Sequence, residues 1–452
     1  MSQNTNQIKE NKMGIMPVGR LLVQMSLPMM ISMLVQALYN IVDSIFVSRI
    51  SEKALTAVSL AFPIQTLIIA VATGTGVGIN ALLSKRLGQK NFEEVNKSAG
   101  NGIFLFILSF IVFIIIGIFV PRVYFESQTD DPEIVKYGVQ YLTVILTVSP
   151  GCFIAILFER LLQSTGLTVL SMVSQLTGAI INIIFDPILI FACGMDITGA
   201  AVATVLGQIV AAIISVVLNL RKNKEIKFAL RYLKPEGQVI ADIYKVGVPS
   251  ILLASIGSVM TYVMNLILGS FSMTAVTVFG VYFKQQSFIF MPIFGMNNGL
   301  VPIIAYNYGA KKRRRIIDTI IVGVKISVGI MFVGLLVFEF FPNQLLSLFD
   351  PSDELLELGR PALRIIGIHF PIAAVCICFF SVFQALGQGV YSMIGSFIRQ
   401  LIVLLPAAWL LSLTGSLTNV WWSFPIAELS ALLVAVFFLR RAYRKYIKPL
   451  PE

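Results

Sequence analysis

Charged side chains are scarce in this 452-residue sequence. Asp, Glu, Lys and Arg make up 13% of it, whereas apolar residues make up 57%. Ordinary globular domains carry roughly 25% charged residues. No charge occurs between Lys97 and Arg122, or between Arg160 and Asp186. Each gap is long enough for the ~20 residues that a helix needs to cross a bilayer, so the composition excludes ordinary soluble proteins and predicts an all-α membrane protein.

The residues on which many enzymes and metal sites depend are also few. The chain has one histidine and four cysteines, and the cysteines all lie within or beside apolar segments. One histidine cannot form a metal cluster, so we interpret the cysteines as packing residues without disulfides. No G-x-x-x-x-G-K-[ST] loop is present, and the glycine-rich segment 73–80 lies in an apolar span with no strand before it. We therefore expect no cofactor, no ATP-driven step and no enzymatic activity.

The second half of the chain repeats the first at an offset of 221 residues. Pro28 matches Pro249, and Gly78 matches Gly299. Further matched pairs are Gly88 with Gly309, Gln163 with Gln384, Gly166 with Gly387, and Met172 with Met393. An internal repeat in a membrane chain is typical of transporters built from two halves.

Hydropathy and the repeat together predict twelve membrane spans. The expected spans are 21–48, 55–83, 99–120, 138–160, 167–192, 197–220, 247–269, 276–306, 317–341, 362–387, 391–412 and 418–439. They divide the chain into an N-lobe at 1–220, a linker at 221–246 and a C-lobe at 247–452. We expect the linker to lie as an amphipathic tether on the membrane surface.

The distribution of Lys and Arg predicts the orientation. Of the 34 basic residues, 26 fall on the side that holds both termini, a count that includes Lys9, Arg160 and Arg399. The opposite loops, 126–133 and 350–357, are acidic. The positive-inside rule therefore predicts that both termini are cytoplasmic in a bacterial-type inner membrane. The net charge of +11 then reflects topology and contact with anionic lipid rather than a nucleic-acid partner.

Carboxylates inside the predicted spans point to function, because ionisable groups are costly there. Asp43 lies late in the first span, and Asp186 lies in the fifth with Asn182 one helical turn earlier. The 221-residue offset maps the two aspartates onto Met264 and Ala407, so only the N-terminal half carries them. Two neighbouring membrane carboxylates repel, which predicts that they share a proton or a cation. The alternative is structural, with Asp186 bracing a kink at the proline that follows it and Asp43 near the outer interface.

Other ionisable residues in the spans have less definite interpretations. Lys284 either pairs with a carboxylate across a cavity or reaches the membrane surface. Glu159 and Arg160 lie at the inner end of their span, where we expect them to reach water or each other. For Glu428 we favour a bracing role, in which it accepts hydrogen bonds from its neighbours, and keep a second proton site as the alternative.

Aromatic residues and methionines are plentiful, with 33 Phe, 13 Tyr and 16 Met. A subset facing a central cavity would suit flat, lipophilic cations through dispersion and cation–π contacts. The residues predicted to line that cavity are Gln36, Tyr39, Asn40, Met172, Gln175 and Lys284, and the predicted conformational hinge is Pro28.

Several segments resemble the MATE family of multidrug and toxic compound extrusion transporters. They include LPMMISMLVQALYNIVDSIFVSRI, GTGVGINALLSKRLGQKN, LLQSTG, NIIFDPILIFACGMDITGAAVAT and VPIIAYNYGA. The resemblance covers nearly the whole chain. It implies two pseudo-symmetric six-helix lobes around a cleft that opens alternately to either side, and export of organic cations in exchange for inward Na⁺ or H⁺. On this basis we expect a monomer whose partners are lipophilic cations and membrane lipid.

The same resemblance implies where the coupling ion binds. The family's N-lobe site uses an aspartate in span 1, an asparagine and an aspartate in span 5 and a threonine in span 6. The corresponding residues here are Asp43, Asn182, Asp186 and Thr204, which would bind H⁺ or Na⁺. Some branches of the family also use carboxylates in spans 7 and 10. Segments 247–269 and 365–387 contain none, which argues against that C-lobe site here.

Two other functions remain open at this stage. A lipid-linked sugar flippase of the same architecture would need arginines in its cavity to hold a pyrophosphate group, whereas few buried cations are expected here. An intramembrane enzyme acting on lipid would need a convergent nucleophile and base or a metal set, which one histidine and scattered cysteines do not supply.

Overall fold

The computed structural model describes residues 10–349 and 352–451, apart from the side chain of Glu52. Lys9 and the start of the acidic segment 350–357 lie outside the described residues. Within these ranges the chain is helical and has no strand. The helices of the first half are α1 (Lys12–Ile15), α2 (Val18–Ser48), α3 (Glu52–Gly88), α4 (Phe92–Gln128), α5 (Pro132–Thr147), α6 (Pro150–Ser164), α7 (Thr168–Pro187) and α8 (Asp196–Lys222).

A short 3₁₀ turn, Leu230–Leu233, leads into the second half. Its helices are α9 (Gly237–Gly269), α10 (Met273–Gly309), α11 (Arg313–Phe340), α12 (Pro342–Ser347), α13 (Asp353–Gly367), α14 (Phe370–Ala385), α15 (Gly389–Phe397), α16 (Leu405–Ser412), α17 (Leu417–Trp421) and α18 (Ser423–Ala442). Three π-helical turns interrupt or end these helices, at Ile188–Ala192, Ile398–Leu404 and Tyr443–Ile447.

The predicted twelve-span, two-lobe fold is confirmed. Among the described residues, 10 helices are long and apolar enough to cross a membrane, and two bent pairs bring the number to 12. The pairs are α5 with α6, bent by 44°, and α13 with α14, bent by 47°. The sequence did not predict these breaks. Pro150 and Pro371 stand at the start of α6 and α14, and a proline lacks the N–H that a continuous helix needs.

Helix α9 begins ten residues before the predicted start of its span at residue 247. Val239, Ile243 and Val246 in this extension are buried and recur on one face. The extension is therefore stabilised by packing, which a hydropathy window does not detect. It shortens the non-helical part of the connection between the lobes.

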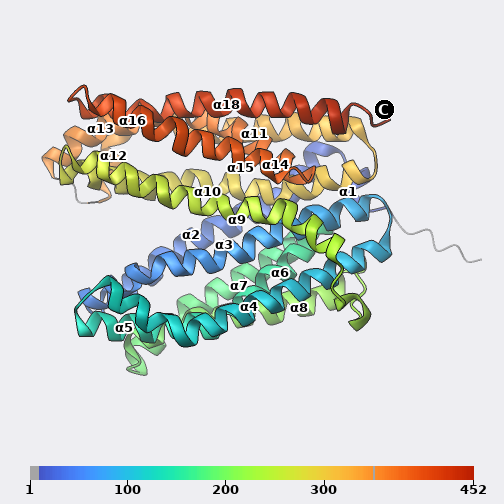
Figure 1. Ribbon diagram of the computed structural model, residues 1–452, viewed down its shortest axis with the longest axis horizontal. Helices are drawn as coiled ribbons and strands as arrows, with labels where there is room; N and C mark the ends of the chain where they lie inside the picture. Colours follow the sequence, from blue (N-terminus) through green and yellow to red (C-terminus); the bar gives the residue numbers. More distant parts are fainter. Residues whose placement is uncertain (1–9, 350–351, 452) are drawn as a thin grey trace, which may run out of the picture.

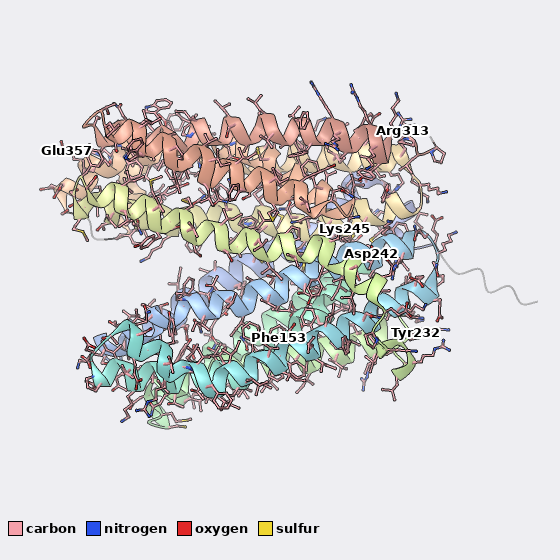
Figure 2. All side chains as sticks on the ribbon, in the orientation of Figure 1. Phe153, Tyr232, Asp242, Lys245, Arg313 and Glu357 are labelled. Carbon is pink, nitrogen blue, oxygen red and sulfur yellow. The ribbon has the colours of Figure 1, made fainter. Side chains whose placement is uncertain are left out.

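The helices form two bundles that converge at one end of the molecule and diverge at the other (Figure 1). Helices α3–α8 make up one bundle and α9–α18 the other, with α2 along the inner side of the first. Arg313 and Lys245 lie where the bundles converge, and Glu357 lies at the far end (Figure 2). We call the converging end, which holds α1 and the C-terminus, the basic end, and the opposite one the splayed end.

The repeat extends to details of the backbone. Ser51 caps α3 by accepting a hydrogen bond from the amide of Ala54, and Ser272 caps α10 in the same way. Gly166 and Gly387, each just after a helix, have φ values of +88° and +74°. Only glycine adopts this conformation at little cost, which explains why both halves keep it.

The lobes meet along a row of glycines that we call the glycine seam. Its members are three 221-offset pairs, Gly74 with Gly295, Gly78 with Gly299, and Gly88 with Gly309. A Cβ atom added to Gly88 would lie 1.9 Å from the carbonyl oxygen of Tyr306, and one added to Gly309 would lie 1.9 Å from that of Lys85. Backbones this close leave no room for a side chain, so the seam lets the lobes close tightly at the basic end.

The N-terminal segment bridges the two lobes at the same end. The side chain of Asn11 donates hydrogen bonds to the carbonyl of Thr165 and to Glu225, at 3.0 Å each. On the C-lobe side, Arg315 donates to the carbonyls of Met13 and Met16 at 3.1 and 2.7 Å. Met13 itself is fully buried. Residues 11–16 therefore hold the closed basic end together.

We expect Arg315→Ala to release this segment. The substitution removes hydrogen bonds from a charged donor to two carbonyls, and such bonds contribute about 1.5–3 kcal/mol each. The amides of residues 13–16 should then exchange faster in hydrogen–deuterium exchange mass spectrometry. The neighbouring Arg314 is exposed, so Arg314→Ala is the matched control and should leave exchange unchanged. Equal exchange in both variants would contradict the bridging role.

Candidate functional site

The predicted N-lobe residues converge at one place. Asp43 near the end of α2 faces Asp186 on α7, and the two carboxyl groups interact directly. Asn182, one turn before Asp186, donates a hydrogen bond to the hydroxyl of Thr204 on α8 at 3.4 Å. The convergence follows from helix packing, because α7 contacts both α2 and α8.

This site has more oxygen acceptors than donors. Asp186 is completely buried, and neither of its carboxylate oxygens has a hydrogen-bond partner. One oxygen of Asp43 and the side-chain oxygen of Asn182 are also unpartnered and buried. Buried acceptors of this kind are costly unless a proton or a cation satisfies them. Oxygen ligands suit a hard cation such as Na⁺, and a carboxylate can equally take a proton.

A cavity of about 1260 Å³ lies between the lobes. It is lined from the N-lobe by α2, α3 and α6–α8, and from the C-lobe by α9, α10, α14, the π turn at Ile398–Leu404 and α18. Asn182 and Thr204 are on its wall, whereas Asp43 and Asp186 are not among the lining residues. The ion site therefore adjoins the cavity through an amide and a hydroxyl.

Four of the six predicted cavity residues line this space: Gln36, Tyr39, Asn40 and Gln175. Met172 does not, because it lies nearer the basic end than any lining residue of α7. Lys284 does not either. Its side chain is exposed and its ammonium group lies 5.7 Å from the ring of Phe349, so it points away from the cavity. Pro28 is buried within α2, which is continuous around it.

Two basic side chains face the cavity rather than the inner surface. Arg160 and Arg399, counted above with the residues at the inner surface, both line the cavity. Arg160 donates to Gln163 at 2.9 Å and to Asn298 of the opposite lobe at 2.8 Å. Its neighbour Glu159 accepts hydrogen bonds from Gln175 at 2.8 Å and from Ser174 at 3.3 Å. Neither Arg160 nor Arg399 belongs to the basic surface, because both side chains face the cavity instead.

The C-lobe wall carries a charged cluster that sequence reasoning did not assemble. Glu428 accepts a hydrogen bond from Arg399 at 3.1 Å, and the Nδ1 atom of His369 lies 3.7 Å from the same oxygen. The hydroxyl of Tyr282 lies 3.3 Å from Nε2 of His369. Arg399 is thus a hydrogen-bond donor of the kind that the predicted bracing role of Glu428 requires. The repeat offered a signal for this pair, since Arg399 and Glu428 map onto two glycines, Gly178 and Gly207.

Comparison with known proteins decides the family. The family model MatE matches residues 28–188 and again 249–410. The chain belongs to the MATE family. The two matches begin at Pro28 and Pro249, the pair that first revealed the repeat.

Relatives of this MATE chain include the multidrug export protein MepA of Staphylococcus haemolyticus, 28% identical over 425 residues, which covers 93% of each chain. MepA of Staphylococcus aureus strain MSSA476 is 27% identical over 439 residues, covering 94% of each. A multidrug resistance MATE transporter of the MOP superfamily, solved in an outward-facing conformation, matches with a TM-score of 0.92 at 26% identity, covering 97% of this chain and 99% of that one.

Another similar structure is a MOP superfamily transporter from Pyrococcus furiosus, described as having a binding pocket of reversed polarity. It matches with a TM-score of 0.89 at 26% identity, covering 97% of this chain and 99% of the other. The description concerns that protein alone.

Proposed function

We propose that this MATE transporter exports lipophilic organic cations across the cytoplasmic membrane in exchange for inward H⁺ or Na⁺. The observation that carries the proposal is the facing pair Asp43 and Asp186, whose three buried, unpartnered oxygens adjoin the cavity through Asn182 and Thr204. The excess of basic residues supports placing the basic end in the cytoplasm. The splayed end would then face outward, and the conformation described here would be outward-facing.

The mechanism follows from competition for negative charge. In the outward-facing state the site takes H⁺ or Na⁺ from outside, which neutralises one of the two carboxylates. A cationic substrate in the adjoining cavity then loses electrostatic attraction and leaves outward. Coupling arises because binding of the ion weakens binding of the substrate, so the two do not occupy the outward-facing state together. Pro28 on α2 is the proposed hinge, since α2 carries Asp43 and also lies on the glycine seam against Gly295 and Gly299.

The cavity wall fits such a substrate. Tyr39, Phe62, Phe290, Phe294 and Phe424 present aromatic surface, and Met33, Met260 and Met291 add flexible apolar contacts. Aromatic faces attract cations, and methionine adapts to ligands of different shape. The acidic members of the wall are Glu159 and Glu428.

The two cavity arginines favour a second candidate, a flippase for lipid-linked pyrophosphate sugars, but their contacts argue against it. Arg399 is paired with Glu428, and Arg160 donates to Gln163 and Asn298 beside the carboxylate of Glu159. A pyrophosphate site needs guanidinium groups whose charge is free for the ligand. We therefore retain the cation exporter.

We expect ethidium efflux from proteoliposomes driven by an imposed gradient of one ion alone. An inward ΔpH or an inward ΔNa⁺ should accelerate efflux on the order of tenfold over vesicles without a gradient. This factor corresponds to a typical coupling free energy between two sites. Protein-free liposomes under the same gradients are the control. If neither gradient accelerates efflux and the protein instead flips a fluorescent lipid-linked pyrophosphate sugar, the proposal of a cation exporter is wrong.

A further inference from the structure

The charged cluster on the C-lobe wall has no counterpart in the other half of the molecule. At the positions of Arg399 and Glu428 the N-lobe has Gly178 and Gly207, and a Cβ atom on either would lie within 2.9 Å of the other's carbonyl oxygen. Two helices pack backbone to backbone there. In the C-lobe the equivalent crossing, between the π turn Ile398–Leu404 and α18, is held by an ion pair instead. The scaffold itself therefore does not require these charges.

The cluster forms a connected path of polar groups. Tyr282 on α10 is 3.3 Å from Nε2 of His369, whose Nδ1 is 3.7 Å from Glu428, and Glu428 accepts a hydrogen bond from Arg399. All four residues line the cavity. Cys376 on α14 also faces Glu428. Among the described residues, these are the charged and titratable groups found to interact with the histidine ring or with Glu428. The apolar rings of Phe290, Phe370 and Phe424 also lie against the histidine ring.

Three atoms of the cluster are buried without a hydrogen-bond partner: Nδ1 of His369, Oε1 of Glu428 and Nε of Arg399. His369 is 3% exposed and Glu428 is 2% exposed. A proton is small enough to reach such enclosed atoms from the cavity along the polar path. Imidazole is the side chain whose ordinary titration lies between about pH 5 and 8.

We propose that His369 and Glu428 form a proton-binding site in the C-lobe, distinct from the Asp43–Asp186 site. Hydronium in the cavity gives up a proton to the imidazole and leaves as water. The imidazolium then has the negative charge of Glu428 3.7 Å from Nδ1 and the Tyr282 oxygen, an acceptor, 3.3 Å from Nε2. Since Arg399 and Glu428 carry opposite charges, the cluster changes from neutral to a net charge of +1.

This change places positive charge on the cavity wall opposite the N-lobe site. The effect of this charge on transport rests on the proposed function, the export of cations. A charge about 8 Å from a bound cation weakens binding on the order of tenfold or more in a medium of effective dielectric constant near 20. Protonation from the outside would therefore help to release the substrate, and the C-lobe would contribute to coupling without the carboxylates that other branches use.

The single histidine of the chain makes the site directly observable. Full-length protein, carrying an affinity tag without histidine, is labelled with ¹⁵N-histidine and placed in lipid nanodiscs, so that its ring nitrogens come from His369 alone. We expect the ring nitrogens to change from the signals of neutral imidazole to those of imidazolium as the pH is lowered from about 8 to about 4. In Glu428→Gln the midpoint should fall by at least about one pH unit, because the neighbouring negative charge is lost. A ring that stays neutral throughout this range overturns the proposal.

The second measurement is the affinity for ethidium as a function of pH, followed by fluorescence anisotropy. Wild-type affinity should weaken on the order of tenfold as the ring protonates, and His369→Gln should lose this component while retaining binding at high pH. Glu339→Gln, which removes an exposed C-lobe carboxylate paired with Arg364, is the matched control. An unchanged pH profile in His369→Gln overturns the proposal. Because wild-type protein that binds and exports no cation at any pH would instead contradict the proposed function, the two failures are distinguishable.

Discussion

Asp43→Asn and Asp186→Asn should each abolish ion-driven efflux while leaving the protein folded. Each substitution removes one of two facing carboxylates whose buried oxygens lack hydrogen-bond partners. Coupling energies between sites are typically 1–3 kcal/mol, so losing the ion's contribution corresponds to a decrease in gradient-driven efflux of up to about a hundredfold. The measurement is ethidium efflux from proteoliposomes under the gradient that drives the wild type.

Folding is the necessary control for this result. An asparagine has nearly the volume of an aspartate and relieves repulsion between like charges, so the melting temperature should stay the same or rise. Glu339→Gln removes an exposed carboxylate, 3.9 Å from Arg364, and should leave efflux unchanged. Wild-type efflux in both aspartate variants would show that these residues serve packing alone.

A double variant separates one shared site from two independent ones. If Asp43 and Asp186 bind a single ion together, the double variant should transport no worse than either single variant, because the interaction is already lost. Additive losses would instead indicate that each carboxylate binds an ion separately.

The N-lobe site was predictable because its chemistry follows regular spacing. Asn182 and Asp186 are one helical turn apart, so any helix brings them to one face. The cost of a carboxylate in an apolar span then marks them as functional. That these two residues converge with Asp43 and Thr204 was predicted from the resemblance to a family. Sequence spacing alone does not determine how α2, α7 and α8 pack.

Arg160 and Arg399 show what hydropathy cannot provide. Arg160 ends the predicted span 138–160 and Arg399 lies within the predicted span 391–412, and we expected both long basic side chains to reach the membrane surface. Here they turn inward, toward Asn298 and toward Glu428. The direction depends on partners about 138 and 29 residues away along the chain, and a window moved along the sequence does not see them. The bends at the α5–α6 and α13–α14 junctions were missed for a related reason, because a proline in an apolar run is also compatible with a continuous, kinked helix.

Gly88→Ala should shift the protein away from the conformation described here. A Cβ atom at this position would lie 1.9 Å from the carbonyl oxygen of Tyr306. Because this oxygen belongs to the backbone, it cannot rotate away as a side chain could. Overpacking of this kind costs about 1–3 kcal/mol, which corresponds to a change of about fivefold to more than a hundredfold in a conformational equilibrium. The lobes should separate at the basic end, and efflux should fall because one of the two alternating states becomes less accessible.

The distance between spin labels tests this directly. Lys222 and Arg314 are exposed at the basic end in opposite lobes, and labels there, in a background without the four native cysteines, should move apart in Gly88→Ala. Gly309→Ala should act in the same way, since its Cβ atom would meet the carbonyl oxygen of Lys85 at the same distance. Gly280→Ala is the matched control, because it lies in α10 like Gly309 but has no atom within 4 Å of an added Cβ. Identical distance distributions in all three variants would show that the seam adjusts to a side chain, and that tight closure at the basic end does not depend on glycine.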